Sequence, residues 1–125
     1  MAKLMLLLTG VSGVLAVVLG AFGAHGLKLR LTENLLAVYQ TGVQYHFYHT
    51  MALGFIALAL YRWPGSTPLI AAGWSFITGI LIFSGSLYLL AITDTKWLGA
   101  ITPIGGVAFI IGWVCVCWFA VKSPS

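Results

Sequence analysis

The run YQTGVQYHFYHTM, residues 39–51, gathers two histidines, two glutamines and three tyrosines. Charged residues make up only 6% of the whole chain, so this concentration of polar side chains stands out. Imidazoles can bind a metal ion, ligate haem iron or carry protons near neutral pH. His46 and His49 are three residues apart, so they share one face if the run is helical. These two residues are therefore the first place to look for chemistry.

His25, the third histidine of the chain, allows two kinds of site with the other two. His25, His46 and His49, with Asp94 as a fourth ligand, would suit zinc or copper. His25 and His49 could instead bind haem iron from opposite sides. Both sites depend on a contact between segments that are far apart in the sequence.

A structural interpretation of the histidines is also open. Neutral imidazoles can form hydrogen bonds between membrane helices with Ser84, Thr102 or backbone exposed by Pro103, each worth about 0.6 kcal/mol. Ser84 and Ser86 in FSGSLY and Thr102 in TPIGG are residue types common where membrane helices pack closely. The same small residues could instead leave room for a ligand among hydroxyl groups. We expect no cofactor.

Composition argues against several functional classes. The six Lys and Arg residues are scattered singly at segment ends, which is typical of membrane anchoring rather than of nucleic-acid binding. Cys115 and Cys117 are two residues apart, a spacing that fits neither a CxxC redox pair nor a metal knuckle. No set of nucleophile, base and carboxylate can be identified, since Glu33 and Asp94 are the only acids. We therefore expect neither an enzyme nor a nucleic-acid partner.

The elements that must position these residues are membrane helices. The chain has 125 residues, and its hydrophobic fraction of 61% is well above that of soluble proteins. A helix of about 20 apolar residues can cross a bilayer. Four stretches qualify, at residues 4–24, 42–61, 69–92 and 98–121. Residues 27–41 are too polar to cross and too apolar for a free loop, so we expect a short interfacial helix there, starting at Thr32. The sequence thus predicts an all-α membrane protein of one domain with four transmembrane helices.

The first of these stretches could be mistaken for a secretory signal peptide, because Lys3 precedes a long apolar run. That run is about 20 residues long, more than the usual 7–15. It also carries small residues at every fourth position, which favours close packing of two helices. These residues are Ser12, Ala16, Gly20 and Ala24. We expect a retained first helix.

Four crossings bring the ends of the first and third helices and the starts of the second and fourth to one membrane side. The second crossing would then carry His46 and His49 about 6–10 Å deep, at 1.5 Å per residue. We expect one polar pocket, entered from this side. Its candidate residues are His25, Gln40, Gln44, Tyr45, His46, His49, Ser84, Ser86, Tyr88 and Thr102.

Helical periodicity divides the second crossing into two stripes. One face holds Tyr39, Gly42, His46, His49 and Leu53. A neighbouring stripe holds Gln40, Gln44 and Tyr48. Because polar side chains need partners in lipid, we expect both stripes to face the bundle interior or the interface.

Four motifs, in order along nearly the whole chain, are GAFGAHGL, YQTG…Y…HT, FSGSLY and TPIGG…GW. Together they resemble the YgdD-like family of small bacterial inner-membrane proteins, a domain-of-unknown-function family with relatives in eukaryotes. The resemblance implies four membrane helices and no established activity. Family members often carry glutamine at the position of His46, which weighs against a metal site that needs His46. The residues that match are Gly23, Ala24, His25, Gly26, Gln40, Thr41, Tyr45, His49, Ser84, Gly85, Ser86, Tyr88, Thr102, Pro103, Gly105, Gly106 and Trp113.

We expect a small, non-catalytic protein of the inner membrane that binds a small ligand, lipid or membrane partner through the polar pocket. The rival expectation is a small transporter or proton-transfer component that uses His25 and His49. Membrane lipids are expected partners, and a homo-oligomer or a larger membrane complex is left open.

The orientation of the chain follows from its charges. The positive-inside count is tied, with Lys3, Arg62 and Lys122 on the terminal side and Lys28, Arg30 and Lys96 on the other. Both acids lie opposite the termini, and the amino terminus adds a cation on its own side. We therefore expect both termini in the cytoplasm.

Overall fold

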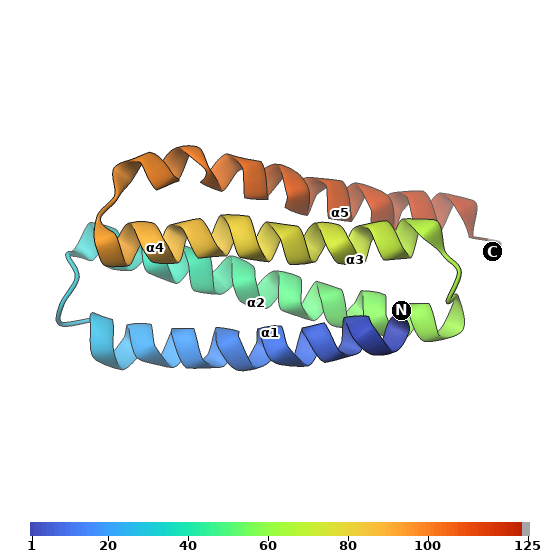
Figure 1. Cartoon of the computed structure of the whole chain (residues 1–125), viewed down its shortest axis with the longest axis horizontal. Coiled ribbons are helices and arrows are strands. Elements are labelled where there is room, and N and C mark those ends of the chain that lie inside the picture. The colour runs from blue at the N-terminus through green and yellow to red at the C-terminus, as the bar shows by residue number, and fades with distance from the viewer. Residues whose placement is uncertain (124–125) are drawn as a thin grey trace.

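The computed structural model describes residues 1–123, and all regular structure in that range is helical. The elements are α1 (Ala2–Phe22), a π-helical stretch (Gly23–Leu27), α2 (Glu33–Arg62), α3 (Thr67–Gly79), a second π-helical stretch (Ile80–Ser84), α4 (Gly85–Thr93), a 3-10 stretch (Lys96–Ala100) and α5 (Thr102–Lys122). Figure 1 shows four long rods side by side, the third formed by α3 and α4 together. The amino terminus, the turn between α2 and α3 and the end of α5 share one end of the bundle, here named the terminal end.

Three of the four rods are long and apolar enough to cross a membrane. They are Ala2–Leu27, Thr67–Thr93 and Lys96–Lys122. α2 has 30 residues, about 45 Å at 1.5 Å per residue, but it carries the polar run and is less apolar than the other helices. The predicted all-α membrane protein with four long helices is confirmed.

The separate interfacial helix that was expected over residues 27–41 is not present. Residues 28–32 form a turn, and α2 starts at Glu33 and continues unbroken to Arg62. Thr32 does mark a helix start, as predicted, since its Oγ1 accepts a hydrogen bond from the Leu35 backbone nitrogen at 3.2 Å. The second long helix therefore begins at residue 33 and not near residue 42.

Gly42 does not interrupt α2, because the close approach of another helix explains this glycine. A Cβ at Gly42 would lie only 3.0 Å from Cε1 of Tyr88. The Gly42 carbonyl also accepts a hydrogen bond of 2.8 Å from the Ser84 hydroxyl. The glycine thus serves the contact between α2 and the third rod.

α2 is the central helix of the bundle. It packs against α1 on one side and against α3 and α4 on another, while α5 packs mainly against α3. Glycines allow this last contact: the Phe109 ring fits against Gly79, and the Phe76 ring fits against Gly112. α1 packs mainly on α2 and leaves most of its apolar side chains exposed, as a lipid-facing helix does.

The core has two apolar ends and a polar middle. Near the terminal end, Leu53, Phe76 and Phe109 belong to the larger apolar cluster. At the other end, Leu27, Tyr39 and Ala91 form a smaller one. Buried polar residues lie between the two clusters along α2 and the third rod, namely His46, His49, Thr50, Ser84 and Ser86.

The two stripes predicted on the second helix have different outcomes. The face formed by Tyr39, Gly42, His46, His49 and Leu53 is buried, as predicted. The stripe of Gln40, Gln44 and Tyr48 is exposed on the outside of the bundle and does not face its interior. The other alternative, that this stripe faces the membrane interface, stays a prediction.

Candidate functional site

His46 and His49 lie near the middle of α2. His46 is 13 residues after Glu33 and 16 residues before Arg62, or about 20 Å and about 24 Å at 1.5 Å per residue. The predicted depth of about 6–10 Å below one membrane surface stays a prediction, because a helix can extend beyond the apolar layer and its first residue does not mark the membrane boundary. Within the bundle, the buried polar residues form a layer between the two apolar clusters.

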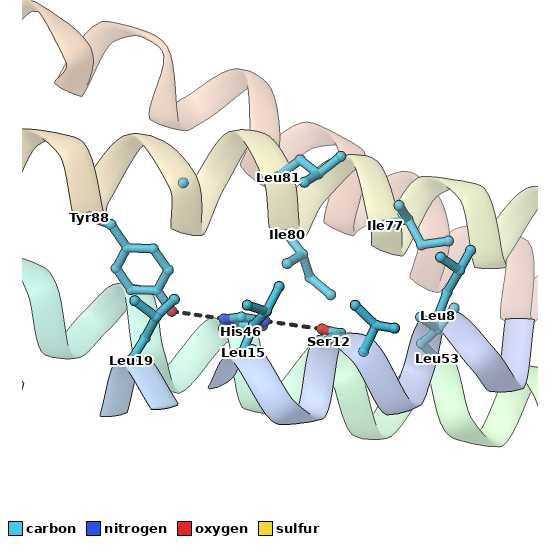
Figure 2. Close-up of a pocket in the computed structure, with 12 residues that line it drawn as sticks. Leu8, Ser12, Leu15, Leu19, His46, Leu53, Ile77, Ile80, Leu81 and Tyr88 are labelled. Carbon is cyan, nitrogen blue, oxygen red and sulfur yellow. Dashed lines mark hydrogen bonds between the residues drawn. The ribbon is translucent and has the colours of Figure 1, made fainter. Parts of the chain in front are cut away.

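His46 lies in a chain of hydrogen bonds that links three helices. Its Nδ1 is 2.8 Å from the Tyr88 hydroxyl on α4, and its Nε2 is 3.0 Å from the Ser12 hydroxyl on α1. Ser12 continues to the Thr50 hydroxyl at 2.6 Å. Figure 2 shows Tyr88 and Ser12 reaching His46 from opposite sides. The imidazole is 3% exposed, so both ring nitrogens depend on these partners.

Each partner in this chain is a hydroxyl group, which can either donate or accept after rotating about one bond. Either neutral tautomer of His46 can therefore be satisfied, with Tyr88 and Ser12 exchanging roles. The chain constrains the position of the ring but not the location of its proton. This is a property of the three residue types that surround the imidazole.

His49 has partners of a different kind. Its Nδ1 lies 2.8 Å from the Tyr45 carbonyl oxygen, and the indole N–H of Trp113 donates to its Nε2 at 3.1 Å. A carbonyl can only accept and an indole N–H can only donate, so Nδ1 carries the proton and Nε2 does not. The ring also stacks on Phe109, with 3.5 Å between centroids and 9° between planes. His49 is therefore held as one neutral tautomer between α2 and α5.

The hydroxyl groups of the third rod, on Ser84 and Ser86, form hydrogen bonds to neighbouring helices and leave little for a ligand. Ser84 donates to the Gly42 carbonyl oxygen on α2. Ser86 donates to the Phe83 carbonyl oxygen and is 2.6 Å from the Thr102 hydroxyl on α5. Within residues 1–123, every fully buried side-chain nitrogen or oxygen has a hydrogen-bond partner. The structural interpretation explains these serines well.

Four predicted site residues lie away from the polar layer. His25 is exposed in the first π-helical stretch, distant from His49 along the bundle. Gln40 and Gln44 line a shallow depression between α1 and α2. The Tyr45 ring is 38% exposed and packs on Phe83, although its carbonyl holds His49. The expected single cluster is thus divided among His46 with Tyr88, His49 with Trp113, and Ser86 with Thr102.

The three-histidine metal site does not assemble. In the part of the chain that the structure describes, no three His, Cys, Asp or Glu side chains gather closely enough to hold a metal ion. His25 lies apart, and both ring nitrogens of His46 and of His49 are engaged by protein groups. The haem alternative fails for the same reason, since it needs His25 opposite His49.

A groove of about 280 Å³ lies beside His46, between α1 and the rod formed by α3 and α4. Its walls are mostly leucine and isoleucine side chains, including Leu15 of α1 and Ile80 of the third rod (Figure 2). His46, Ser12 and Tyr88 lie along its floor, with their polar atoms turned toward one another. The surface that the groove offers to a ligand is therefore almost entirely carbon.

Sequence reasoning missed Ser12 and Thr50. By sequence alone, Ser12 belongs to a packing stripe of small residues, and Thr50 is only the end of the polar run. Which hydroxyl meets His46 depends on how α1 is rotated and shifted against α2, which periodicity in one helix does not determine. The available signal was the position of Ser12 near the middle of a mostly apolar first helix, in which Thr9 is the other hydroxyl side chain.

Comparisons with known proteins identify relatives of this chain. A family model described as "Protein of unknown function (DUF423)" matches residues 19–106. The UPF0382 membrane protein YwdK of Bacillus subtilis is 48% identical over 120 residues, which cover 96% of this chain and 98% of the relative. A UPF0382 membrane protein of Haemophilus influenzae is 42% identical over 120 residues, covering 96% and 95%.

The UPF0382 membrane protein SAB0533 of Staphylococcus aureus is 45% identical over 114 residues, which cover 90% of both chains. No solved structure matches the chain. The names of the relatives agree with the bundle of apolar helices described above. This chain is a multi-pass membrane protein and belongs to the DUF423 family, with UPF0382 membrane proteins as its relatives.

Proposed function

We propose that the protein is a non-catalytic component of the bacterial inner membrane that holds a hydrocarbon chain, of a lipid or of another apolar small molecule, in the groove beside His46. The observation that carries this proposal is the groove itself, formed where α1 packs on α2 without closing against α3 and α4. Its volume of about 280 Å³ is close to the lower end of small-molecule pockets, about 300–1,000 Å³.

The lining of the groove supports a chain-like apolar ligand. Eight of its side chains are branched aliphatics from three different rods: Leu8, Val11, Leu15, Leu19, Leu53, Ile77, Ile80 and Leu81. The polar atoms on the floor already have partners inside the protein, so a polar ligand would have to break those hydrogen bonds. An acyl or isoprenyl chain needs only close packing against the walls.

The geometry gives little support to proton transfer through His25 and His49. Protonation of His49 at Nε2 would place two N–H groups against each other, because Trp113 can only donate. His25 is exposed and shares no hydrogen-bond chain with His49 among the described residues. Binding without proton transfer is therefore the better function for this bundle.

We further propose that both termini face the cytoplasm. The terminal end carries Lys3, Arg62, Lys122 and the first amino group, whereas Glu33 and Asp94 offset the cations at the other end. An impermeant thiol reagent applied to intact cells should label Leu29→Cys, in the exposed turn between α1 and α2, and should not label Gly65→Cys. The reverse pattern would invert the proposed orientation.

Gly85 offers a direct way to fill the groove. It lines the groove, and a Cβ at this position meets nothing within 4 Å. Gly85→Leu should therefore occupy the space without displacing the helix. Gly10 is a matched control, because its Cβ also meets nothing and it lies on the lipid-facing side of α1, away from the groove.

The test uses a fatty acid with a photoreactive group in its chain, incorporated in phosphatidylcholine nanodiscs with the purified protein. Crosslinks should concentrate on residues 8–19 and 77–88, disappear in Gly85→Leu and persist in Gly10→Leu. Even labelling of all lipid-facing helices, or equal labelling of the two variants, would reject the groove as a binding site.

A further inference from the structure

A second pocket, of about 440 Å³, lies at the terminal end of the bundle, away from the groove. It is formed by the turn between α2 and α3 together with the last turns of α5. Both basic residues of these segments, Arg62 and Lys122, line it. Two cations from different helices therefore converge on one hollow.

Aromatic rings lie beside both cations of this pocket. The Arg62 guanidinium carbon is 5.2 Å from the centre of the Trp63 ring, and the Lys122 ammonium nitrogen is 5.3 Å from that of Trp118. Trp63 in turn packs edge-on against Phe119 of α5, at 5.1 Å between centroids. The contact joins the end of α2 to the end of α5, and cation–π attraction keeps each charge near a ring.

The charged side chains at this end of the bundle are all positive. Glu33 and Asp94, the only acidic side chains of the sequence, both lie at the opposite end of the bundle. α3 starts beside the pocket, where Ser66 caps the helix, so the positive end of its dipole adds to the field of the two cations. A negative ligand here meets three positive elements and no side-chain carboxylate.

We propose that this pocket binds the phosphate group of an anionic molecule. Arginine can bind two phosphate oxygens at once, and lysine adds a second, freely placed charge. The rings of Trp63 and Phe119 provide apolar walls beside the cations, as suits a phosphate attached to a glycerol and acyl chains at the membrane boundary. The site shares no lining residue with the groove and does not depend on the function proposed for it.

The experiment measures which lipids stay on the protein. The protein is placed in nanodiscs of phosphatidylcholine with a minor fraction of phosphatidylglycerol, and retained lipids are counted by native mass spectrometry. Arg62→Gln/Lys122→Gln removes both cations. Lys28→Gln/Arg30→Gln removes two cations from the opposite end and serves as the matched control. Helicity and thermal unfolding in pure phosphatidylcholine verify that both variants fold.

The unmodified protein should retain phosphatidylglycerol in preference to phosphatidylcholine. Each surface cation contributes about fivefold to the binding of anionic lipid, so the Arg62/Lys122 variant should lose about twenty-fivefold. The control should keep the preference, and Arg62→Lys should keep most of it. Equal losses in the two double variants would overturn the site, and no preference in the unmodified protein would exclude a lipid headgroup as the source of the phosphate.

A second experiment distinguishes soluble phosphate from a lipid headgroup as the ligand of this pocket. Inorganic phosphate is added to the protein in pure phosphatidylcholine nanodiscs, and the melting temperature is recorded. A rise that the Arg62/Lys122 variant lacks would support a site for soluble phosphate, whereas retention of phosphatidylglycerol without such a rise supports a lipid headgroup. Neither signal in a folded protein would reject the proposal.

Discussion

His46 and His49 are three residues apart on one helix and almost equally buried, at 3% and 5% exposed. Their partners differ in kind. His46 is surrounded by hydroxyls on α1, α2 and α4 that can exchange donor and acceptor roles, whereas His49 lies between a carbonyl that only accepts and an indole that only donates. The first histidine can change its proton position in place, and the second cannot.

This difference shows that the role of a buried histidine depends on its hydrogen-bond partners more than on how deeply it is buried. Both imidazoles belong to one polar run, and sequence reasoning assigns the same candidate roles to each. The partners separate them: His49 joins α2 to α5 by a fixed hydrogen bond and an aromatic stack, while His46 supports the floor of a groove. Three predictions follow from this contrast, from the largest expected effect to the smallest.

Gly105→Ala should disturb the surroundings of His49 and spare those of His46. A Cβ at Gly105 would overlap the backbone nitrogen of Phe83 and lie 2.7 Å from its Cα, so α5 would have to move away from the third rod. We expect a loss of about 3 kcal/mol, the upper end of the range for overpacking. Unfolding in mixed micelles measures it.

Gly106→Ala is the matched control for this substitution, because its Cβ would meet the Phe83 ring at an ordinary 3.8 Å. It should leave stability unchanged within about 0.5 kcal/mol, as surface substitutions usually do. Similar losses for the two alanines would mean that close contact at Gly105 does not hold α5 in place.

Replacing each histidine by glutamine compares the two surroundings directly. His49→Gln loses the stack on Phe109 and leaves the Trp113 indole without its acceptor, so we expect a loss of about 1–3 kcal/mol. His46→Gln keeps an amide that can both donate and accept toward Tyr88 and Ser12, so we expect a change within about 0.5 kcal/mol.

Thermal stability of both glutamine variants, with and without a chelator, provides the measurement. A chelator should not change the thermal stability of either variant or of the unmodified protein. Equal damage from the two substitutions, or a chelator effect that His46→Gln abolishes, would favour a metal site that contains both histidines.

Ser12→Ala should have the smallest effect. It removes the link between α1 and His46, and hydrogen bonds between membrane helices are worth about 0.6 kcal/mol on average. Because Ser12 acts through His46, the same substitution made in a His46→Leu background should cost clearly less. Equal costs in both backgrounds would mean that Ser12 stabilises the bundle through Thr50 alone.

Much of the fold could be predicted from the sequence, because length and apolarity decide where a helix can cross a membrane. The buried face of α2 was also predictable, since periodicity fixes which residues share a side. The start of α2 could not be predicted, because polar side chains such as Glu33 and Gln40 suggest that the membrane helix begins after them. A helix can, however, extend beyond the apolar layer without a break.

The candidate site was predictable in part. The sequence identified His46, His49, Ser84 and Thr102 as polar groups in need of partners, and the structure gives a partner to each. The choice of partners depends on the rotation and offset of neighbouring helices. A single sequence contains too little information on these quantities to pair His46 with Ser12 or His49 with Trp113.

The polarity of α2 also has a consequence for how the chain enters the membrane. A helix that carries two histidines and two glutamines gains less from insertion than its neighbours, since polar residues oppose entry into the apolar layer. The other three rods are apolar enough to insert by themselves. α2 should therefore enter late, or as a hairpin with α1 or α3, which would shield its polar face. In that sequence of events, Ser12 and Tyr88 would reach His46 during assembly and retain α2 in the membrane.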